Sequence, residues 1–296
     1  MKAQLECFCC NLRQAQEAAE TAGKDNSFIW RISQRVCQEY VQADPQWTPA
    51  YMTTLAHRIA QDMVEIEDIF QEQKKYYNRL ALELYPRLKI YVENSKNRLE
   101  TALRIAIAGN IIDLGVYREI KVEEILHQIE HTPWGIYDWD EFQANLNKSQ
   151  ILVYVGDNAG EVVFDRVFLE EINQYHKIYF IVKDRPISND ALLEDALEAG
   201  IDKVATIMTT GKGEIGIDID QAPQAVQDIW KKADCILSKG QGNFETLSDS
   251  NANIYFFAQS EMFASISRIR CQTGSSYLEK KSKFRNIKLH LPKFRF

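Results

Sequence analysis

The chain has 296 residues, of which 45% are hydrophobic and 26% charged, an ordinary globular composition with room for one large or two smaller folded units. Its formal net charge of -7 argues against nucleic acid as the main partner, because binding to a phosphate backbone normally requires a basic surface. Residues 1–10 lack the apolar run of a signal peptide, and no stretch approaches the ~18 apolar residues of a membrane span, so we expect a cytoplasmic protein without a membrane partner. Six cysteines are too few for a disulfide scaffold in so long a chain.

The first half of the sequence predicts helices. Thr48 is a suitable N-cap with Pro49 at the first helical position, and they begin a predicted helix over residues 48–66. Apolar residues recur at every fourth position of this helix and predict one buried face, formed by Tyr51, Leu55, Ile59 and Met63. The same kind of pattern predicts helices over residues 4–22, 27–42, 67–93, 95–109 and 120–130. We therefore expect residues 1–150 to form an all-helical subdomain.

After residue 150, short β-rich runs alternate with amphipathic stretches of helical length. The predicted strands cover residues 151–157, 177–184, 203–208, 234–240 and 253–258. The predicted helices between them cover residues 159–175, 189–199, 222–233 and 243–249. This alternation is typical of a parallel sheet covered on both faces. The expected fold class is α/β, with a mostly parallel sheet in residues 151–257 and a helical N-terminal subdomain.

Polar residues stand at the carboxyl ends of three predicted strands, where open α/β sheets bind their ligands. Asp157 and Asn158 follow the first strand, and Lys239 ends the fourth. Lys183 ends the second strand, and Asp190 opens the helix after it. We therefore expect acidic, amide and cationic groups to converge at one edge of the sheet.

Carboxylate and amide oxygens of this kind suit magnesium, manganese or a similar divalent ion. Asp157, Asn158 and Asp190 could supply three such oxygens, and a metal held there would neutralise phosphate charge and acidify water for in-line attack. Lys239 would bring a positive charge to the phosphoryl oxygens. A structural interpretation is also open, because Asp and Asn after a strand commonly form a turn and a helix N-cap.

Four blocks of sequence resemble the motifs of the damage-control phosphatase family, formerly catalogued as domain of unknown function 89. The blocks are GDNAGE at residues 156–161, KDRPISNDA at 183–191, KGQGNFE at 239–245, and the segment 104–113 that contains GNIID. Cys7 and Cys10 resemble the CxxC of prokaryotic members of the family. The resemblance extends from about residue 4 to residue 257.

This resemblance implies a helical subdomain on an α/β/α sandwich and metal-dependent hydrolysis of small phosphorylated metabolites, such as sugar phosphates or phosphopantetheine-like compounds. It places a divalent cation (Mg, Mn, Co or Ni) on Asp157, Asn158 and Asp190. The residues expected to be catalytic are Asp157, Asp190 and Lys239. Those expected to contact substrate are Asn110, Lys183, Lys239, Asn243 and Glu245. Those expected to orient ligands are Glu161, Asn243 and Glu245.

Two other functions are alternatives at this point. Residues 258–296 depart from the family pattern and carry nine basic and two acidic residues, so we expect a divergent basic tail, and turnover lost through this change would leave a metal- or metabolite-binding protein. Methyl transfer from S-adenosylmethionine to a carboxyl group would need an adenosine-binding loop. Residues 211–216 match GxGxxG, but Pro223 and an irregular stretch follow instead of a helix, so we interpret them as a loop.

Cysteines and histidines are weaker metal candidates. Cys7, Cys9 and Cys10 lack a second CxxC, and a structural zinc is the less favoured interpretation. His127 and His131 lack the glutamate of a metalloprotease motif and are interpreted as surface residues. The sequence makes no prediction of the oligomeric state.

Overall fold

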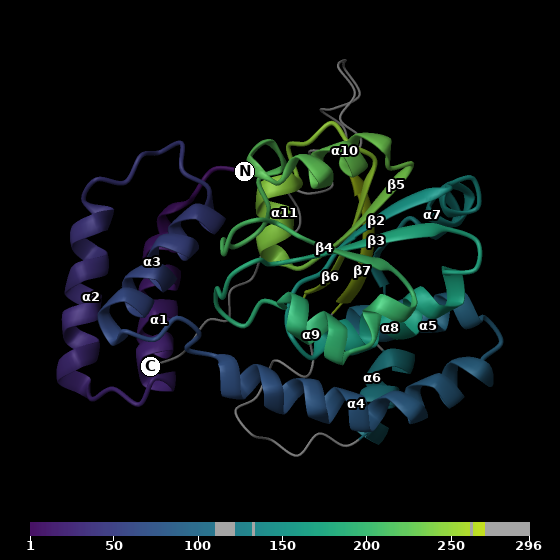
Figure 1. The fold of residues 1–296 in the computed structure, drawn as a ribbon, viewed down its shortest axis with the longest axis horizontal. Coiled ribbons are helices and arrows are strands. Elements are labelled where there is room, and N and C mark those ends of the chain that lie inside the picture. The colour runs from purple at the N-terminus through teal and green to yellow at the C-terminus, as the bar shows by residue number, and fades with distance from the viewer. Residues whose placement is uncertain (110–121, 132–133, 261–262, 270–296) are drawn as a thin grey trace.

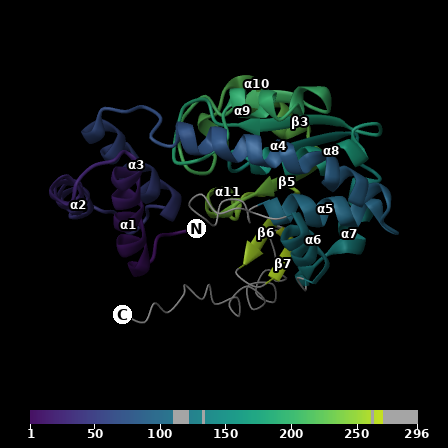
Figure 2. The same ribbon diagram turned by 90° about the horizontal axis from the view of Figure 1, so that it is seen from below.

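The computed structural model describes residues 1–109, 122–131, 134–260 and 263–269, which form two parts (Figure 1). Helices α1 (Leu5–Thr21), α2 (Asn26–Tyr40) and α3 (Pro49–Val64) form a bundle at one side. The later elements form an α/β body beside this bundle, and Figure 2 shows the same separation from below. The predicted helical N-terminal region is therefore divided between a separate bundle and helices that cover the sheet.

Helix α3 begins as predicted but buries a different face. The Oγ1 of Thr48 accepts a hydrogen bond from the N–H of Tyr51 at 3.1 Å, which confirms Thr48 as the N-cap. The predicted buried stripe is wrong at Tyr51, whose side chain is 50% exposed. The apolar residues that α3 buries in the bundle are Met52, Ala56, Ile59, Ala60 and Val64. A row of every fourth residue turns about 40° per step around a helix of 3.6 residues per turn, so it leaves the contact face.

Seven strands form one sheet in the order β1-β7-β6-β5-β2-β3-β4. Neighbouring strands are parallel except β6 and β7, which run antiparallel. The strands in chain order are β1 (Trp134–Tyr137), β2 (Ile151–Val155), β3 (Lys177–Val182), β4 (Thr206–Thr209), β5 (Cys235–Lys239), β6 (Ile254–Ser260) and β7 (Phe263–Ile269). Strands β2 to β6 confirm the five predicted strands and the parallel α/β arrangement.

Helices cover both faces of this sheet. Tyr154 and Phe180 belong to one apolar core with α5, α7 and α8, whereas Val153 and Ile181 belong to a second core with α10 and α11. Because successive strand residues point to opposite faces, one strand feeds both cores, and the expected α/β/α sandwich is confirmed. Helix α4 packs outside α8 (Figure 2). The helices of the body are α4 (Gln71–Glu93), α5 (Arg98–Ala108), α6 (Val122–His131), α7 (Trp139–Leu146), α8 (Glu161–Ile172), α9 (Leu193–Glu198), α10 (Gln224–Lys232) and α11 (Gln241–Leu247), with 3-10 turns η2 (Ile201–Lys203) and η3 (Ile219–Gln221).

Strands β1 and β7 correct the expected division of the chain. Strand β1 lies inside residues 1–150, which were expected to be all-helical, and β7 lies inside the expected basic tail 258–296. The two strands pair with each other at the edge of the sheet. Four residues are too few to show a strand alternation, and the partner is distant in sequence, so no local pattern predicts β1. The boundaries at residues 150 and 257 otherwise stay a prediction.

Residues 211–216 form a loop, and the next element is the short turn η3 rather than the helix that a dinucleotide fingerprint requires. Within the ranges that the structure describes, no helix is both long enough and apolar enough to cross a lipid bilayer.

Candidate metal centre and active site

Two loops at the carboxyl ends of β2 and β3 form the centre of the site. The β2 loop (residues 156–160) carries Asp157 and Asn158, and the β3 loop (residues 183–192) carries Asp190. Asn158 and Asp190 form an isolated antiparallel backbone bridge. The N–H of Ala159 donates to the carbonyl of Asn189 at 2.9 Å, and the N–H of Ala191 donates to the carbonyl of Asp157 at 2.8 Å. Because β2 and β3 are parallel neighbours, their following loops meet, and the structure brings the three predicted metal ligands together.

Asp157 occupies a narrow place beside the turn from β5 to α11. Gly240 has φ 82°, and a Cβ built there would lie 2.0 Å from the Oδ2 of Asp157, so only glycine allows this approach. Asn243, on the first turn of α11, donates from its Nδ2 to the carbonyls of Gly156 at 3.0 Å and Lys239 at 2.7 Å. Asn243 thus joins the turn before α11 to the start of the β2 loop, and its predicted contact with substrate stays a prediction.

The electrostatics of the two carboxylates suit a bound cation. Burial raises the pKa of Asp157 well above its usual value, and the negative charges of Glu161 and Asp190 raise it further, against Lys239 and Lys183. Burial also raises the pKa of Asp190, against the attraction of Lys183 and Lys74. A divalent cation would relieve this crowding of negative charge.

The donor chemistry fits a hard divalent ion. Two carboxylates and the amide of Asn158 meet at the paired loops, and the buried Oδ1 of Asn243 makes no hydrogen bond to the described residues. Within the described ranges, no three or more His, Cys, Asp or Glu side chains gather as a metal-binding group, so amide oxygens and water would have to complete the coordination. For the same reason, the described residues offer no cysteine zinc site around Cys7 and Cys10.

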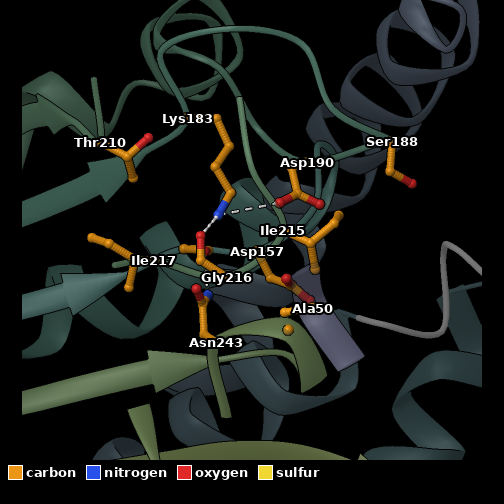
Figure 3. Close-up of polar contacts among 12 residues, drawn as sticks. Ala50, Asp157, Lys183, Ser188, Asp190, Thr210, Ile215, Gly216, Ile217 and Asn243 are labelled. Atoms are coloured by element: carbon orange, nitrogen blue, oxygen red, sulfur yellow. Dashed lines mark hydrogen bonds and ion pairs between the residues drawn. The ribbon is translucent and has the colours of Figure 1, made fainter. Parts of the chain in front are cut away.

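Lys183 links the β3 loop to the loop of residues 211–216. Its Nζ lies 3.4 Å from the Oδ2 of Asp190 and donates a hydrogen bond to the carbonyl of Gly216 (Figure 3). The side chain is buried. Two of its three ammonium protons are thus directed at named partners, and its charge lies beside the carboxylates.

Lys239 points to a different partner from the one that the sequence suggests. Its Nζ lies 2.6 Å from the Oε2 of Glu161 and 3.0 Å from the Oδ1 of Asp165, and it donates to the carbonyl of Ala106 at 2.7 Å. Burial lowers the pKa of Lys239, but the two carboxylates raise it more, so the net shift is upward and the ammonium stays charged. These three contacts engage all three protons of the ammonium group, so none is left for a phosphoryl oxygen in this arrangement. The predicted contact of Lys239 with substrate stays a prediction.

The structure indicates a positioning role for Lys239 through Glu161. The Oε1 of Glu161 accepts a hydrogen bond from the Nδ2 of Asn158 at 3.0 Å, which fixes the orientation of the amide. Side chains alternate between the two faces of β5, so Lys239 points to the same face as Leu237 and to the opposite face from Ile236. Its side chain therefore enters the core that lies under α5 and α8. The predicted role of Glu161 in orienting a ligand agrees with this geometry.

Glu245, a predicted substrate residue, has its hydrogen-bond partners away from the paired loops. Glu245 accepts a hydrogen bond at Oε1 from Gln241 at 2.7 Å, and its backbone carbonyl accepts one from the amino terminus at 3.2 Å. It lies two residues beyond Asn243, about 200° around α11, so its side chain faces away from Asp157. The predicted contact of Glu245 with substrate stays a prediction. Asn110 lies outside the described residues.

Asp165 is a buried charged residue of the site that sequence reasoning missed. Its Oδ1 accepts hydrogen bonds from Lys239 at 3.0 Å and from the hydroxyl of Tyr154 at 2.7 Å. The available signal was its position four residues after Glu161, with apolar residues at 162–164 and 167–169, where an unpaired buried carboxylate would be costly.

Helix α3 lies over the mouth of the site. The N–H of Ile215 donates to the Oγ1 of Thr54 at 2.9 Å, which joins the loop of residues 211–216 to this helix. A cavity of about 680 Å³ opens between α3 and the β3 loop. Its charged lining residues are Arg58 and Arg185 with Asp62, Glu65 and Glu67, and the three predicted metal ligands are not among its lining residues. The structure thus offers a polar space beside the paired loops, which the sequence did not predict.

Comparisons with known proteins identify the family of the chain. The chain matches the model of the damage-control phosphatase ARMT1-like domain over residues 3–281. It is 33% identical over 258 residues to a damage-control phosphatase of Archaeoglobus fulgidus, which covers 85% of this chain and 89% of the relative. A damage-control phosphatase of Pyrococcus horikoshii is 30% identical over 264 residues, with 87% and 90% covered.

A crystal structure of a DUF89 family protein from Pyrococcus horikoshii superposes with a TM-score of 0.82 and 26% sequence identity. The match covers 91% of this chain and 100% of that chain. The family model, the relatives and the shared fold together show that this chain belongs to the damage-control phosphatase family with an ARMT1-like domain.

Proposed function

We propose that this protein is a metal-dependent phosphatase that hydrolyses a small phosphorylated metabolite, such as a sugar phosphate or a phosphopantetheine-like compound. The observation that carries the proposal is the backbone pairing of the β2 loop with the β3 loop, which gathers two carboxylates and an amide at the sheet edge. Membership of a phosphatase family supports the reaction class. The chemistry of the donor set supports the metal.

Asp157, Asn158 and Asp190 would hold the cation, and magnesium, manganese, cobalt and nickel all accept such oxygen donors. A bound divalent cation supplies charge neutralisation at a phosphoryl group and acidifies water. Glu161 holds the amide of Asn158, and Lys239 holds Glu161, so the ligand orientation is fixed before substrate binds.

Lys183 is the residue best placed to meet the phosphoryl group directly. Two of its protons are directed at Asp190 and at the carbonyl of Gly216, which leaves the third for a phosphoryl oxygen. Its positive charge would offset part of the negative charge that a phosphate ester brings to the carboxylates.

The cavity beside α3 supports a small polar substrate. Its volume of about 680 Å³ lies in the range of small-molecule sites. Arg58 and Arg185 in its lining could bind anionic or hydroxyl groups, while Asp62 could accept hydrogen bonds from hydroxyls.

The test is phosphate release from a panel of sugar and cofactor phosphates by metal-stripped protein. Magnesium, manganese, cobalt and nickel are restored one at a time. We expect turnover only with metal, and a loss on the order of 100-fold or more in Asp157→Asn and Asp190→Asn, because each removes a charged ligand.

Asp184→Asn is the matched control, since this exposed carboxylate follows Lys183 and bonds to the side chain of Thr209 at 2.9 Å. Turnover that persists in fully stripped protein would contradict the metal requirement. Metal binding without turnover across the panel would favour a non-catalytic metal- or metabolite-binding protein.

A further inference from the structure

We infer that Asn78 of α4, acting with Asp195 of α9, is a positioning residue that holds the β2 loop and the β3 loop at the separation a cation requires. The inference rests on the metal site of the proposed function. It concerns a helix that contributes no ligand and that the sequence analysis connected with no function.

Asn78 binds the β2 loop directly. Its Oδ1 accepts a hydrogen bond from the N–H of Gly160 at 2.6 Å, and its side chain is fully buried. Gly160 has φ 81°, and a Cβ built there would lie 2.9 Å from the Cβ of Tyr77, so this loop rests against the backbone of α4. Gly160 is two residues from Asn158, and a shift of this contact would move a metal ligand.

The amide nitrogen of Asn78 extends the connection to the β3 loop. Its Nδ2 donates to the Oδ1 of Asp195 at 2.7 Å and to the Oε2 of Glu198 at 3.1 Å. The Oδ2 of Asp195 accepts from the N–H of Leu192 at 2.8 Å, two residues after Asp190. One continuous chain of hydrogen bonds thus runs from one loop through Asn78 and Asp195 to the other.

A buried lysine balances the charge of this connection. The Nζ of Lys74 lies 2.7 Å from the Oδ2 of Asp68 and 3.8 Å from the Oδ2 of Asp195. Apolar side chains would pack α4 against the body without the desolvation that these buried polar groups require. The hydrogen bonds of the Asn78 side chain go to the β2 loop and to two carboxylates of α9, one of which binds the β3 loop. The buried amide therefore serves to fix the two loops in one arrangement.

Another residue of α4 provides a matched control. The hydroxyl of Tyr85 donates to the Oε1 of Glu170 on α8 at 2.5 Å, far along the helix from both loops. Tyr85→Phe therefore removes a hydrogen bond between α4 and α8 but leaves the loop connection intact.

The experiment measures the affinity of metal-stripped protein for Mn²⁺ by titration calorimetry, without substrate. Asn78→Leu removes all three hydrogen bonds in a similar volume, and Asn78→Asp keeps the acceptor for Gly160 but places a carboxylate against Asp195 and Glu198. We expect affinity for Mn²⁺ to fall about 10- to 100-fold in each, and to stay within about twofold of the parent in Tyr85→Phe. Combining Asn78→Asp with Asp195→Asn restores an amide–carboxylate pair, and we expect it to recover most of the lost affinity.

Parent affinity in both Asn78 variants, with folding verified by circular dichroism, would overturn the inference, as would an equal loss in Tyr85→Phe. Should Asn78→Leu fail to fold, Asn78→Asp and its combination with Asp195→Asn carry the same test. Absence of phosphate release in a protein that binds Mn²⁺ would count against the proposed function alone. Turnover of the parent protein tests the proposed function, whereas the Mn²⁺ affinity of the variants tests the role of Asn78. The two failures are therefore distinguishable.

Discussion

The two ends of helix α8 carry acidic residues in opposite environments. At the amino end, Glu161 and Asp165 are buried and share one cation, Lys239. At the carboxyl end, Glu170 and Glu171 retain contact with solvent and share several cations, namely Lys89, Arg98 and Arg166. The same chemical groups therefore serve two purposes: the inner set orients a ligand of the proposed metal centre, and the outer set ties surface helices together.

The two ends of α8 differ in which groups can take the place of a removed cation. Water and neighbouring cations can take over at the outer end, because every charged group there is reached by more than one partner or by solvent. At the inner end no other ammonium or guanidinium is among the contacts of Glu161 and Asp165 in the described structure. Removal of one cation should thus have very different effects at the two ends.

Replacement of Lys239 at the inner end should have the largest effect. Lys239→Met leaves Glu161 and Asp165 buried without their cation, and we expect a loss of about 3–5 kcal/mol in the free energy of unfolding. Urea denaturation of metal-free protein measures it, with Lys89→Met as the control. A loss below about 1 kcal/mol would show that the inner set tolerates change as the surface does.

Protonation of Asp165 should have an effect of intermediate size on the free energy of unfolding. Burial raises the pKa of Asp165 to about 6, with Lys239 opposing and Glu161 adding to the increase. Because the folded protein holds this proton more tightly than the unfolded chain, stability falls as pH rises from about 4 to about 6.

Asp165→Asn should abolish this contribution. Relative to the parent, the variant should gain up to roughly 3 kcal/mol in the free energy of unfolding as the pH is raised through that window. Denaturation of metal-free protein at several pH values between 4 and 7 provides the measurement. Parallel curves for the parent and the variant would mean that Asp165 is not the titrating group.

Replacement of Lys89 at the outer end should have the smallest effect. Glu170 also accepts hydrogen bonds from Tyr85 at 2.5 Å and Arg166 at 2.8 Å, so Lys89→Met leaves it with partners. We expect a loss of at most about 1 kcal/mol, which diminishes further in high salt. A larger loss that is insensitive to salt would erase the distinction between the two ends.

Sequence patterns predicted the part of the site that depends on local order. The alternation of strands and helices predicts β2 to β6, and the rule that parallel strands end at one edge of the sheet predicts that Asp157 and Asp190 lie together. These features depend on periodicity and on chain direction, which a single sequence contains.

Features that depend on the orientation of a side chain were not predicted. Lys239 ends its strand as expected, yet the alternation of β5 turns it into the core rather than toward the open edge. Asn78 gives no signal in the sequence, because its partners Gly160 and Asp195 come from two distant elements that only the folded chain brings to α4. The strand β1 was missed for the same reason, since its partner is β7.

The placement of β7 between β6 and β1 sets an order of assembly. β1 lies at the edge and has β7 as its neighbour, although its residues are synthesised long before those of β7. The neighbour of Trp134–Tyr137 in the sheet is thus available only after residues 263–269 have been synthesised. Because pairing of β1 with β7 closes a long loop, we expect it to form later and more slowly than the N-terminal helices. A chain that ends before residue 263 would retain the paired metal loops but would leave Trp134–Tyr137 without its place in the sheet.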